Sequence, residues 1–387
     1  MALALVAGAL SWWLWGRTAT PLPQPETSAT SGLRPRYLGS FGDTGPKRLI
    51  EPLGVAVAGD RVYVADAGAR VVAVFDRAGT RVATLSGGGL KLLAYVAVDP
   101  RDGHLVVSDR QTGTLVVFGA DGKARGVFDP KLPMGVATTG TATPWKPLAA
   151  AFAEDGTLYV TDTSRQHRVL VFGPDGSYRR ALTGSTAGEL SYPNGVAVLG
   201  RDVVVADSNN ARLLVFAPDG SVALEVRTGG LPRGVAVVMH RRGTTVAGDL
   251  VVADTIGRKL TFWASDGSPL GEAGRAGSGG GEFSFPTDVS AGDGGTVYVT
   301  DTGNRRVQMW SIGSGFSGPP PHVSLPAARP WWLYAAVAAA VVALIAGLAA
   351  LAVSTVRHRR SRTSSDAGAE GRRNAGRKGA ERGPDKV

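Results

Sequence analysis

The sequence contains no cysteine in 387 residues, so a disulfide framework, a thiolate nucleophile and a thiolate metal site are excluded. Five histidines are present, and none of them has metal-ligand spacing with another. The chain also lacks a Gly-x-Ser-x-Gly nucleophile elbow and a phosphate loop followed by a helix. We therefore expect no metal, no cofactor and no catalysis. The histidines are His104, His167, His240, His322 and His358.

The formal net charge of +10 is unevenly distributed. Residues 357–387 carry ten Lys or Arg against four Asp or Glu, which places +6 of that charge in the last 31 residues. The rest of the chain is only mildly basic, so the charge gives little support for nucleic-acid binding. Nucleic acid is therefore not an expected partner.

One phrase recurs six times along the chain. Its clearest copy is TVYVTDTGNRRVQMW at 296–310, an alternating strand, an aspartate, a polar turn with arginine, and a second strand ending in an aromatic residue. The first and last aspartates lie 235 residues apart over five intervals, a mean period of 47 residues. This period, with four strands in each unit, predicts a β-propeller. The repeated aspartates are Asp66, Asp109, Asp162, Asp207, Asp254 and Asp301.

Each repeat predicts four strands. The first is small and apolar, as in GVAVA at 54–58 and GVAVL at 195–199, which suits the position nearest the axis. The second ends at the aspartate, and the third ends in a large ring that can pack between neighbouring sheets. Asp-Gly turns lead from most third strands into the fourth. The ring residues are Phe75, Phe118, Phe172, Phe216, Trp263 and Trp310.

The sixth repeat has no fourth strand of its own. After Trp310 the chain enters a proline-rich segment that cannot form a central strand. A matching run, RYLGSFG at 36–42, precedes the first repeat and is predicted to close the last blade, which removes an open sheet edge. Two insertions interrupt the period, at 129–146 between blades and at 239–249 between first and second strands.

These residues resemble the NHL repeat, in which a PxGVAV phrase precedes D-[ST]-x-N-x-R-V-x-V-F. Residues 301–310 with Pro286 match most fully, and residues 207–216 with Pro193 follow. Thr114 and Val71 depart from the pattern, since they stand where the family has a basic residue. The resemblance covers about residues 36–315 and implies a platform that binds protein or RNA, or an extracytoplasmic sensor.

Both ends of the chain carry apolar segments. Residues 2–15 would form a helix of about 21 Å, shorter than the ~30 Å hydrocarbon core, and fit a secretory signal, an anchor or a buried helix. Residues 331–356 are uncharged and long enough to span a bilayer; the arginines that follow predict a cytoplasmic tail and an outward-facing propeller.

The predicted fold is all-β, a six-bladed β-propeller closed by an N-terminal strand, with a C-terminal transmembrane helix. In order, the chain has a signal-like or anchor segment (1–16), a linker (17–35), the propeller (36–316), a proline-rich spacer (317–330), a transmembrane helix (331–356) and a disordered basic tail (357–387). We expect a cell-membrane protein with a single pass at 331–356, and a second span at the N-terminus remains open.

The aspartates are expected to hold the turns that follow them, because a feature present in every blade is structural. The turn cations either pair with these aspartates or form a basic face for an anionic partner, and Arg165, Lys259 and Arg305 are expected to be the least needed by their own aspartates. The candidate basic face comprises Arg70, Arg110, Arg165, Arg168, Arg212, Arg258, Lys259, Arg305 and Arg306.

The function we expect is non-catalytic. A membrane-anchored, extracytoplasmic propeller would bind a protein or an anionic ligand as a scaffold or sensor. The alternative is a metal-dependent hydrolase or lyase that uses the central channel. The first strands argue against that alternative, because they are almost entirely Val, Ala and Gly, with Asn194 and Asp288 only at their edges.

Overall fold

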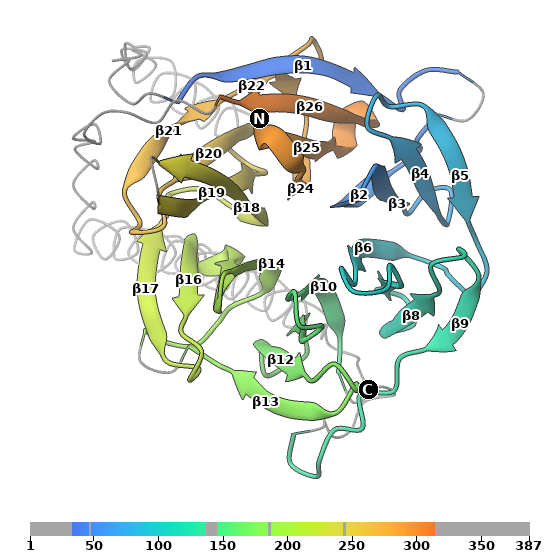
Figure 1. Cartoon of the computed structure of the whole chain (residues 1–387), viewed down its shortest axis with the longest axis vertical. Coiled ribbons are helices and arrows are strands. Elements are labelled where there is room, and N and C mark those ends of the chain that lie inside the picture. Colours follow the sequence, from blue (N-terminus) through green and yellow to red (C-terminus); the bar gives the residue numbers. More distant parts are fainter. Residues whose placement is uncertain (1–32, 46–47, 137–144, 185–186, 243–244, 314–387) are drawn as a thin grey trace, which may run out of the picture. The chain divides into compact units, whose positions relative to one another are not determined.

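Four-stranded antiparallel sheets are the repeating unit of this protein. The computed structural model describes residues 33–45, 48–136, 145–184, 187–242 and 245–313, all within the first of the two units of the chain, Met1–Pro321. Six such sheets surround an axis as the blades of a propeller (Figure 1). The predicted all-β, six-bladed architecture is confirmed.

The strands follow one another along the chain within each blade. Blades 1 to 3 are β2 (Pro52–Ala58), β3 (Arg61–Asp66), β4 (Val71–Asp76), β5 (Arg81–Leu85); β6 (Leu93–Val98), β7 (Leu105–Asp109), β8 (Thr114–Phe118), β9 (Ala124–Val127); and β10 (Pro147–Phe152), β11 (Leu158–Asp162), β12 (Arg168–Phe172), β13 (Tyr178–Leu182). Blades 4 and 5 are β14 (Pro193–Leu199), β15 (Asp202–Asp207), β16 (Arg212–Phe216), β17 (Val222–Arg227); and β18 (Pro232–Arg242), β19 (Thr245–Asp254), β20 (Lys259–Trp263), β21 (Pro269–Ala273).

The N-terminal strand completes the last blade, as the sequence predicted. Blade 6 consists of β24 (Pro286–Ala291), β25 (Thr296–Asp301), β26 (Arg306–Ile312) and β1 (Pro35–Phe41). The pairing of β1 with β26 is antiparallel and runs from Pro35 opposite Ile312 to Phe41 opposite Val307. A short parallel pair, β22 (Arg275–Ala276) with β23 (Glu282–Phe283), precedes this blade.

The core lies between the blades. All six third-strand rings are buried, as predicted, because each fills the space between two sheets. Hydroxyl groups add contacts between blades: in three blades the residue after the repeated aspartate donates to the carbonyl of the first proline of the next blade. These bonds join Ser208 to Pro232 (2.5 Å), Thr255 to Pro286 (2.6 Å) and Thr302 to Pro52 (2.6 Å).

Both predicted insertions modify connections between strands. The hairpin of β18 and β19 is lengthened to Arg242 and Thr245. The connection from blade 2 to blade 3 leads to Trp145, which is buried against Phe128 and Phe172 at ring-centroid distances of 6.1 and 5.8 Å. An apolar side chain within this insertion therefore belongs to the core, which the sequence pattern did not indicate.

The predicted segments at the two ends of the chain lie outside the described residues. These are the signal-like or anchor segment 1–16, most of the linker 17–35, the spacer 317–330, the transmembrane helix 331–356 and the tail 357–387. Within the described ranges, no helix has the length and apolar character needed to cross a membrane.

Candidate functional site

Two kinds of loop form one face of the propeller, named here the turn face. The first kind is the turn between the second and third strands of each blade. The second is the segment that enters each first strand, such as Ile50–Glu51, whose backbone N–H groups donate to Asp66 at 3.0 and 2.8 Å. Antiparallel pairing places both loops at the same end of the sheet, because each first strand begins where its second strand ends.

The six repeated aspartates lie beneath this face and are at most 6% exposed. Each carboxylate accepts hydrogen bonds from the entering segment and from its own turn. Asp109, for example, accepts from the backbone N–H groups of Lys91, Leu92, Gln111 and Thr112 at 2.5 to 3.1 Å. Burial alone would raise the pKa of Asp109, but these donors outweigh it and hold the pKa below its ordinary value.

Three of the predicted ligand-binding arginines are buried and paired within their own blade. Arg168, Arg212 and Arg306 donate from Nε to Asp162, Asp207 and Asp301 at 2.9, 2.7 and 2.9 Å. Each is the first residue of its third strand, and the strand register places it directly opposite the aspartate. Their guanidinium groups therefore face inward and hold the turn, which is the first of the two roles considered for the turn cations.

The last residue of each turn points a different way, because its backbone is left-handed. φ at this position lies between 37° and 69° in all six blades. Arg70 and Arg305 are exposed here, and Arg258 is partly exposed. An exposed arginine at the end of a turn therefore occupies a different structural position from the arginine that pairs with the aspartate. The six residues are Arg70, Gly113, His167, Ala211, Arg258 and Arg305.

The remaining predicted cations also differ in how available they are to a ligand. Arg110 and Arg165 are exposed in the turns of blades 2 and 3. Lys259 is paired with Glu272 on the neighbouring strand, and is thus less available to a ligand. Lys91 and Lys146 are also exposed on this face, and their position just before a first strand is the signal that could have identified them.

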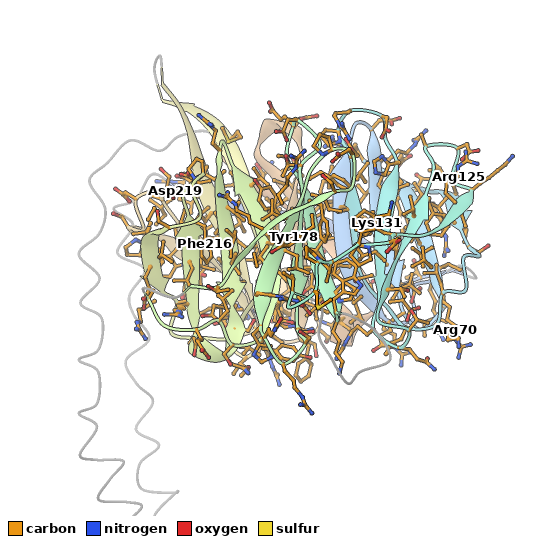
Figure 2. All side chains as sticks on the ribbon, turned by 90° about the horizontal axis from the view of Figure 1, so that it is seen from below. Arg70, Arg125, Lys131, Tyr178, Phe216 and Asp219 are labelled. Carbon is orange, nitrogen blue, oxygen red and sulfur yellow. The ribbon has the colours of Figure 1, made fainter. Side chains whose placement is uncertain are left out.

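An arc of mixed basic and apolar side chains covers the turn face over blades 5, 6 and 1. Ile256 is 71% exposed and Phe285 is 52% exposed, with the Arg258 guanidinium 5.4 Å from the Phe285 ring centroid. Arg70 lies at one end of the blades, and Asp219 and Arg125 lie toward the opposite end (Figure 2). We name the set the basic–apolar arc: Ile50, Arg70, Ile256, Arg258, Phe285 and Arg305.

A second polar group surrounds the axis at the level where the first strands begin. Tyr95, Asn194, Arg233 and Asp288 come from blades 2, 4, 5 and 6. Burial raises the pKa of Asp288 to about 7, although the backbone N–H groups of Val55 and Val289 and the charge of Arg233 act to lower it. Sequence reasoning placed Asn194 and Asp288 at strand edges and missed the other two, because their approach depends on closure of the ring.

The side chains near the axis do not fit a metal ion. Asp288 is the one carboxylate within the six first strands, and its oxygens accept from Val55 and Val289 N–H groups, both at 2.9 Å. The cationic Arg233 acts on the same carboxylate. A divalent cation needs several oxygen or nitrogen ligands and would be repelled by the guanidinium.

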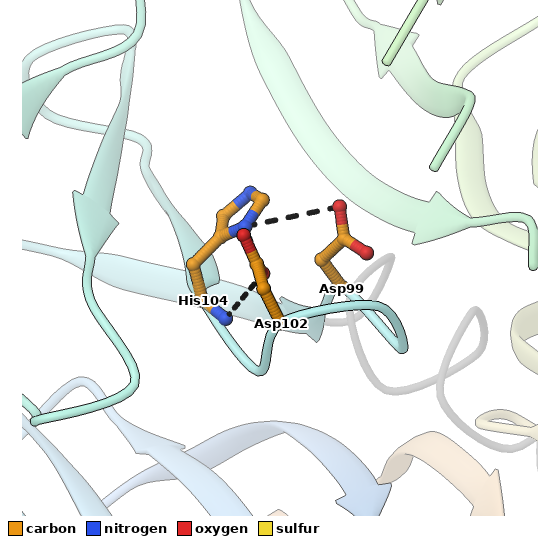
Figure 3. A group of neighbouring side chains, drawn as sticks. All are labelled: Asp99, Asp102 and His104. Carbon is orange, nitrogen blue, oxygen red and sulfur yellow. Dashed lines mark hydrogen bonds and ion pairs between the residues drawn. The ribbon is translucent and has the colours of Figure 1, made fainter. Parts of the chain in front are cut away.

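Asp99, Asp102 and His104 converge on the opposite face, in the hairpin between β6 and β7 (Figure 3). His104 Nδ1 lies 2.6 Å from Asp102 and 3.7 Å from Asp99. The sequence analysis did not identify this group, although its three members lie within six residues. Arg101 already binds the buried Asp99 carboxylate at 2.7 Å. This arrangement fits a charged turn better than a cation site.

The same arginine also joins two blades. A Cβ at Gly156 in blade 3 would lie 1.9 Å from Arg101 Cζ, so the guanidinium of blade 2 packs directly on this glycine. Burial raises the pKa of Asp99, but its bonds to Arg101 outweigh this and keep the pKa below its ordinary value. A neighbouring pocket of about 180 Å³ is lined in part by Arg101 and Gly156, so this contact between blades 2 and 3 forms part of its wall.

Comparison with known proteins identifies the repeats and the fold. The sequence model of the NHL repeat matches residues 190–216 and 283–309, which lie in blades 4 and 6. A gluconolactonase from Xanthomonas campestris is similar in structure, with a TM-score of 0.54 and 18% identity over 72% of this chain and 94% of that one. Virginiamycin B lyase from Staphylococcus aureus has a TM-score of 0.49 and 13% identity over 76% and 90%. No curated protein sequence matches the chain.

Proposed function

Because the chain is an NHL-repeat β-propeller, we propose that it is a binding module whose turn face takes an acidic, partly apolar peptide segment of a partner protein. The basic–apolar arc is the observation that carries this proposal. Arginine and aromatic residues are enriched where proteins bind one another, and an exposed Phe and two exposed Ile beside three cations give such a composition.

Charge complementarity favours an acidic partner. Arg70, Arg258 and Arg305 have no ion pair with the repeated aspartates, whereas the strand-three arginines of blades 3, 4 and 6 are each neutralised by one. Lys91, Arg110, Lys146 and Arg165 extend the positive charge over blades 2 and 3. Exposed cations of this kind attract anionic groups over a screening length of about 8 Å at 0.15 M salt.

A metal-dependent hydrolase or lyase is the weaker alternative. The axis offers one carboxylate, already engaged with two backbone N–H groups and next to Arg233. The gluconolactonase is an enzyme, but at 18% identity the likeness of this chain to it extends to the fold alone. We therefore favour binding without catalysis.

Neutralising the arc should weaken peptide binding without unfolding the propeller. Peptides selected from a displayed random library should be rich in Asp, Glu and apolar residues. The combined Arg70→Asn, Arg258→Asn, Arg305→Asn variant should bind them about tenfold or more weakly, since exposed charge pairs contribute up to ~1 kcal/mol each. Asparagine tolerates the left-handed backbone at these positions, so the melting temperature should change little.

The matched control removes the same charge from the opposite face. Arg125→Asn, Arg179→Asn, Arg201→Asn should leave peptide affinity within about twofold. Arg125 and Arg179 lie near the starts of β9 and β13, and Arg201 lies in the hairpin between β14 and β15, all at the end of the blades opposite the turn face. Selected peptides that are uncharged and whose binding ignores salt would contradict the proposal, as would equal losses in the two triple variants.

We also propose that the propeller is displayed on the outer side of the cell membrane. The support comes from the sequence: an uncharged segment at 331–356 precedes Arg357, Arg359, Arg360 and Arg362. Protease added to intact cells should release the propeller by cleavage near 317–330 and spare a tag fused after Val387. Digestion of the tag while the propeller survives would reverse the orientation.

A further inference from the structure

A cavity of about 180 Å³ opens between blades 2 and 3 at the end of the blades opposite the turn face, and we name it the blade 2–3 pocket. Its wall includes the hairpin between β6 and β7, the hairpin between β10 and β11, and the turn between β12 and β13. An apolar protein cavity of about 150 Å³ holds a benzene molecule. The blade 2–3 pocket therefore has the volume for a single aromatic ring.

The floor of the pocket is apolar and comes from both blades. Val106 and Val117 lie opposite each other on β7 and β8, and they pack toward Phe152 and Leu158 of blade 3. Val117 is partly exposed, because part of its side chain lines the pocket. The residues at the same place in blades 1, 3 and 4 are buried, so the junction of blades 2 and 3 is more open at this position. Those residues are Val74 (4% exposed), Val171 (3%) and Val215 (4%).

Glycines leave part of the blade 3 side of the pocket without side chains. Gly156, Gly173 and Gly176 line the pocket there. Gly156 and Gly176 have φ of 82° and 77°, a left-handed backbone that glycine adopts more easily than any other residue. The backbone geometry of two blade 3 turns therefore helps to keep this space open.

His104 brings one polar group to the pocket. Its ring lines the pocket and lies against the Phe152 ring, with 5.3 Å between the centroids. His104 Nδ1 is 2.6 Å from an Asp102 oxygen. An ionised carboxylate only accepts hydrogen bonds, so Nδ1 carries the proton. In the neutral imidazole, Nε2 is then an acceptor.

This acceptor is available to a ligand. Nε2 points away from the carboxylates of Asp99 and Asp102 (Figure 3). Within the described residues it has no hydrogen-bond partner. A ligand in the pocket should therefore carry an O–H or N–H donor next to its ring, because a donor in this position completes the hydrogen bonding of the histidine.

The charges around the pocket disfavour an anion. The backbone N–H of His104 holds the pKa of Asp102 below its ordinary value, and the pKa of Asp99 is lowered as well, so both groups are ionised. The one guanidinium that lines the pocket, that of Arg101, is already bound to Asp99 at 2.7 Å. Desolvating a charged ligand on the apolar floor would also be costly. A neutral ligand fits this environment best.

We propose that the blade 2–3 pocket binds a neutral phenol, with its ring on the apolar floor and its hydroxyl donating to His104 Nε2. A phenol hydroxyl can both donate and accept, so it suits either protonation state of the imidazole. A free small phenol and the tyrosine side chain of a partner protein present the same chemistry. The site lies on the face opposite the basic–apolar arc and does not depend on the proposed peptide binding.

Titration of the whole chain with defined probes, followed by ligand-observed NMR, tests the pocket. Phenol should bind with a Kd of about 1 mM or tighter, and anisole, which lacks the donor, about tenfold more weakly, the effect of one hydrogen bond. Benzoate should bind at least tenfold more weakly than phenol. N-acetyltyrosinamide distinguishes the two sources: affinity equal to or above that of phenol identifies a tyrosine side chain, and affinity at least tenfold lower identifies a free small phenol.

His104→Phe keeps a ring next to Phe152 and removes the acceptor. Phenol affinity should fall about tenfold, to that of anisole, while anisole affinity stays within about twofold. A disturbance of the fold would instead change both affinities. The arc triple variant on the turn face should retain phenol binding, which separates this pocket from the proposed peptide surface.

Val117→Phe fills the pocket with a protein ring. Phenol and anisole should both lose at least tenfold in affinity, and the melting temperature should change little because the new ring occupies existing space. Val127→Phe is the matched control: Val127 is 53% exposed on β9 of the same blade and does not line the pocket. This control should leave both affinities within about twofold.

Three outcomes would overturn the phenol site. One is that no probe binds at millimolar concentration. Another is equal affinity for phenol and anisole in the native chain, or equal losses of both in His104→Phe, since the histidine would then not bind the hydroxyl. The third is phenol binding that Val117→Phe leaves intact, which would place the ligand elsewhere on the protein.

Discussion

Removal of the N-terminal strand should abolish cooperative folding of the whole propeller. β1 supplies the outer strand of blade 6 and pairs with β26 over its full length. Phe41 also contacts the Phe75 and Tyr298 rings at centroid distances of 4.7 and 6.4 Å, so it joins blade 6 to blade 1. Losing one such ring costs ~3–5 kcal/mol, against a total stability of about 5–15 kcal/mol.

Thermal and urea unfolding of a chain lacking Pro35–Phe41 measure this effect. We expect no cooperative transition, or a midpoint lower by tens of degrees, because an open blade also exposes the edge of β26. A synthetic peptide of residues 33–42 should restore the transition, and a scrambled peptide of the same composition should not. An unchanged melting curve for the deletion would show that β1 is not required for closure.

Replacing the aspartate of blade 6 should destabilise the protein more than replacing that of blade 1. Asp301 accepts from the buried Arg306 and from Ser284, Asn304 and Gln308. Within the described residues, the donors to Asp66 are all backbone N–H groups. Asp301→Ala leaves a buried guanidinium without its carboxylate, which costs ~3–5 kcal/mol. Asp66→Ala leaves unpaired amides, for which we expect ~1–3 kcal/mol.

A double-mutant cycle separates the ion pair from the turn. Arg306→Met added to Asp301→Ala should recover part of the lost free energy of unfolding, because the unpaired buried charge is removed. The same substitution in the native chain should be destabilising. Urea midpoints with unchanged slopes provide the measurement. Equal losses for Asp66→Ala and Asp301→Ala would show that the buried arginine adds nothing to the turn.

Comparison of the six turns shows why the sequence alone does not separate the roles of the basic residues. A turn that ends in Arg-Arg, as at Arg305 and Arg306, places consecutive arginines in opposite environments. The first has a left-handed backbone and faces solvent, and the second begins a strand opposite Asp301. A one-residue difference in register decides which cation is available. The sequence shows both arginines but does not separate their roles.

Local patterns determined the blades of this protein. Each hairpin, Asp-Gly turn and third-strand ring depends on residues close together in the chain, so the repeat alone predicted six four-stranded sheets, and the missing last strand predicted closure by the N-terminus. Such features can be predicted because their strand pairing and side-chain alternation repeat in every unit.

The polar side chains near the axis and the residues of the basic–apolar arc come together only in the tertiary structure. Tyr95 and Arg233 are separated by three blades in sequence, and they approach each other only when the ring closes. Ile50 and Phe285 likewise share one face because blade 6 adjoins blade 1. The sequence placed each residue at a strand end, but contacts between distant strands depend on how the sheets pack around the axis, which no local pattern encodes.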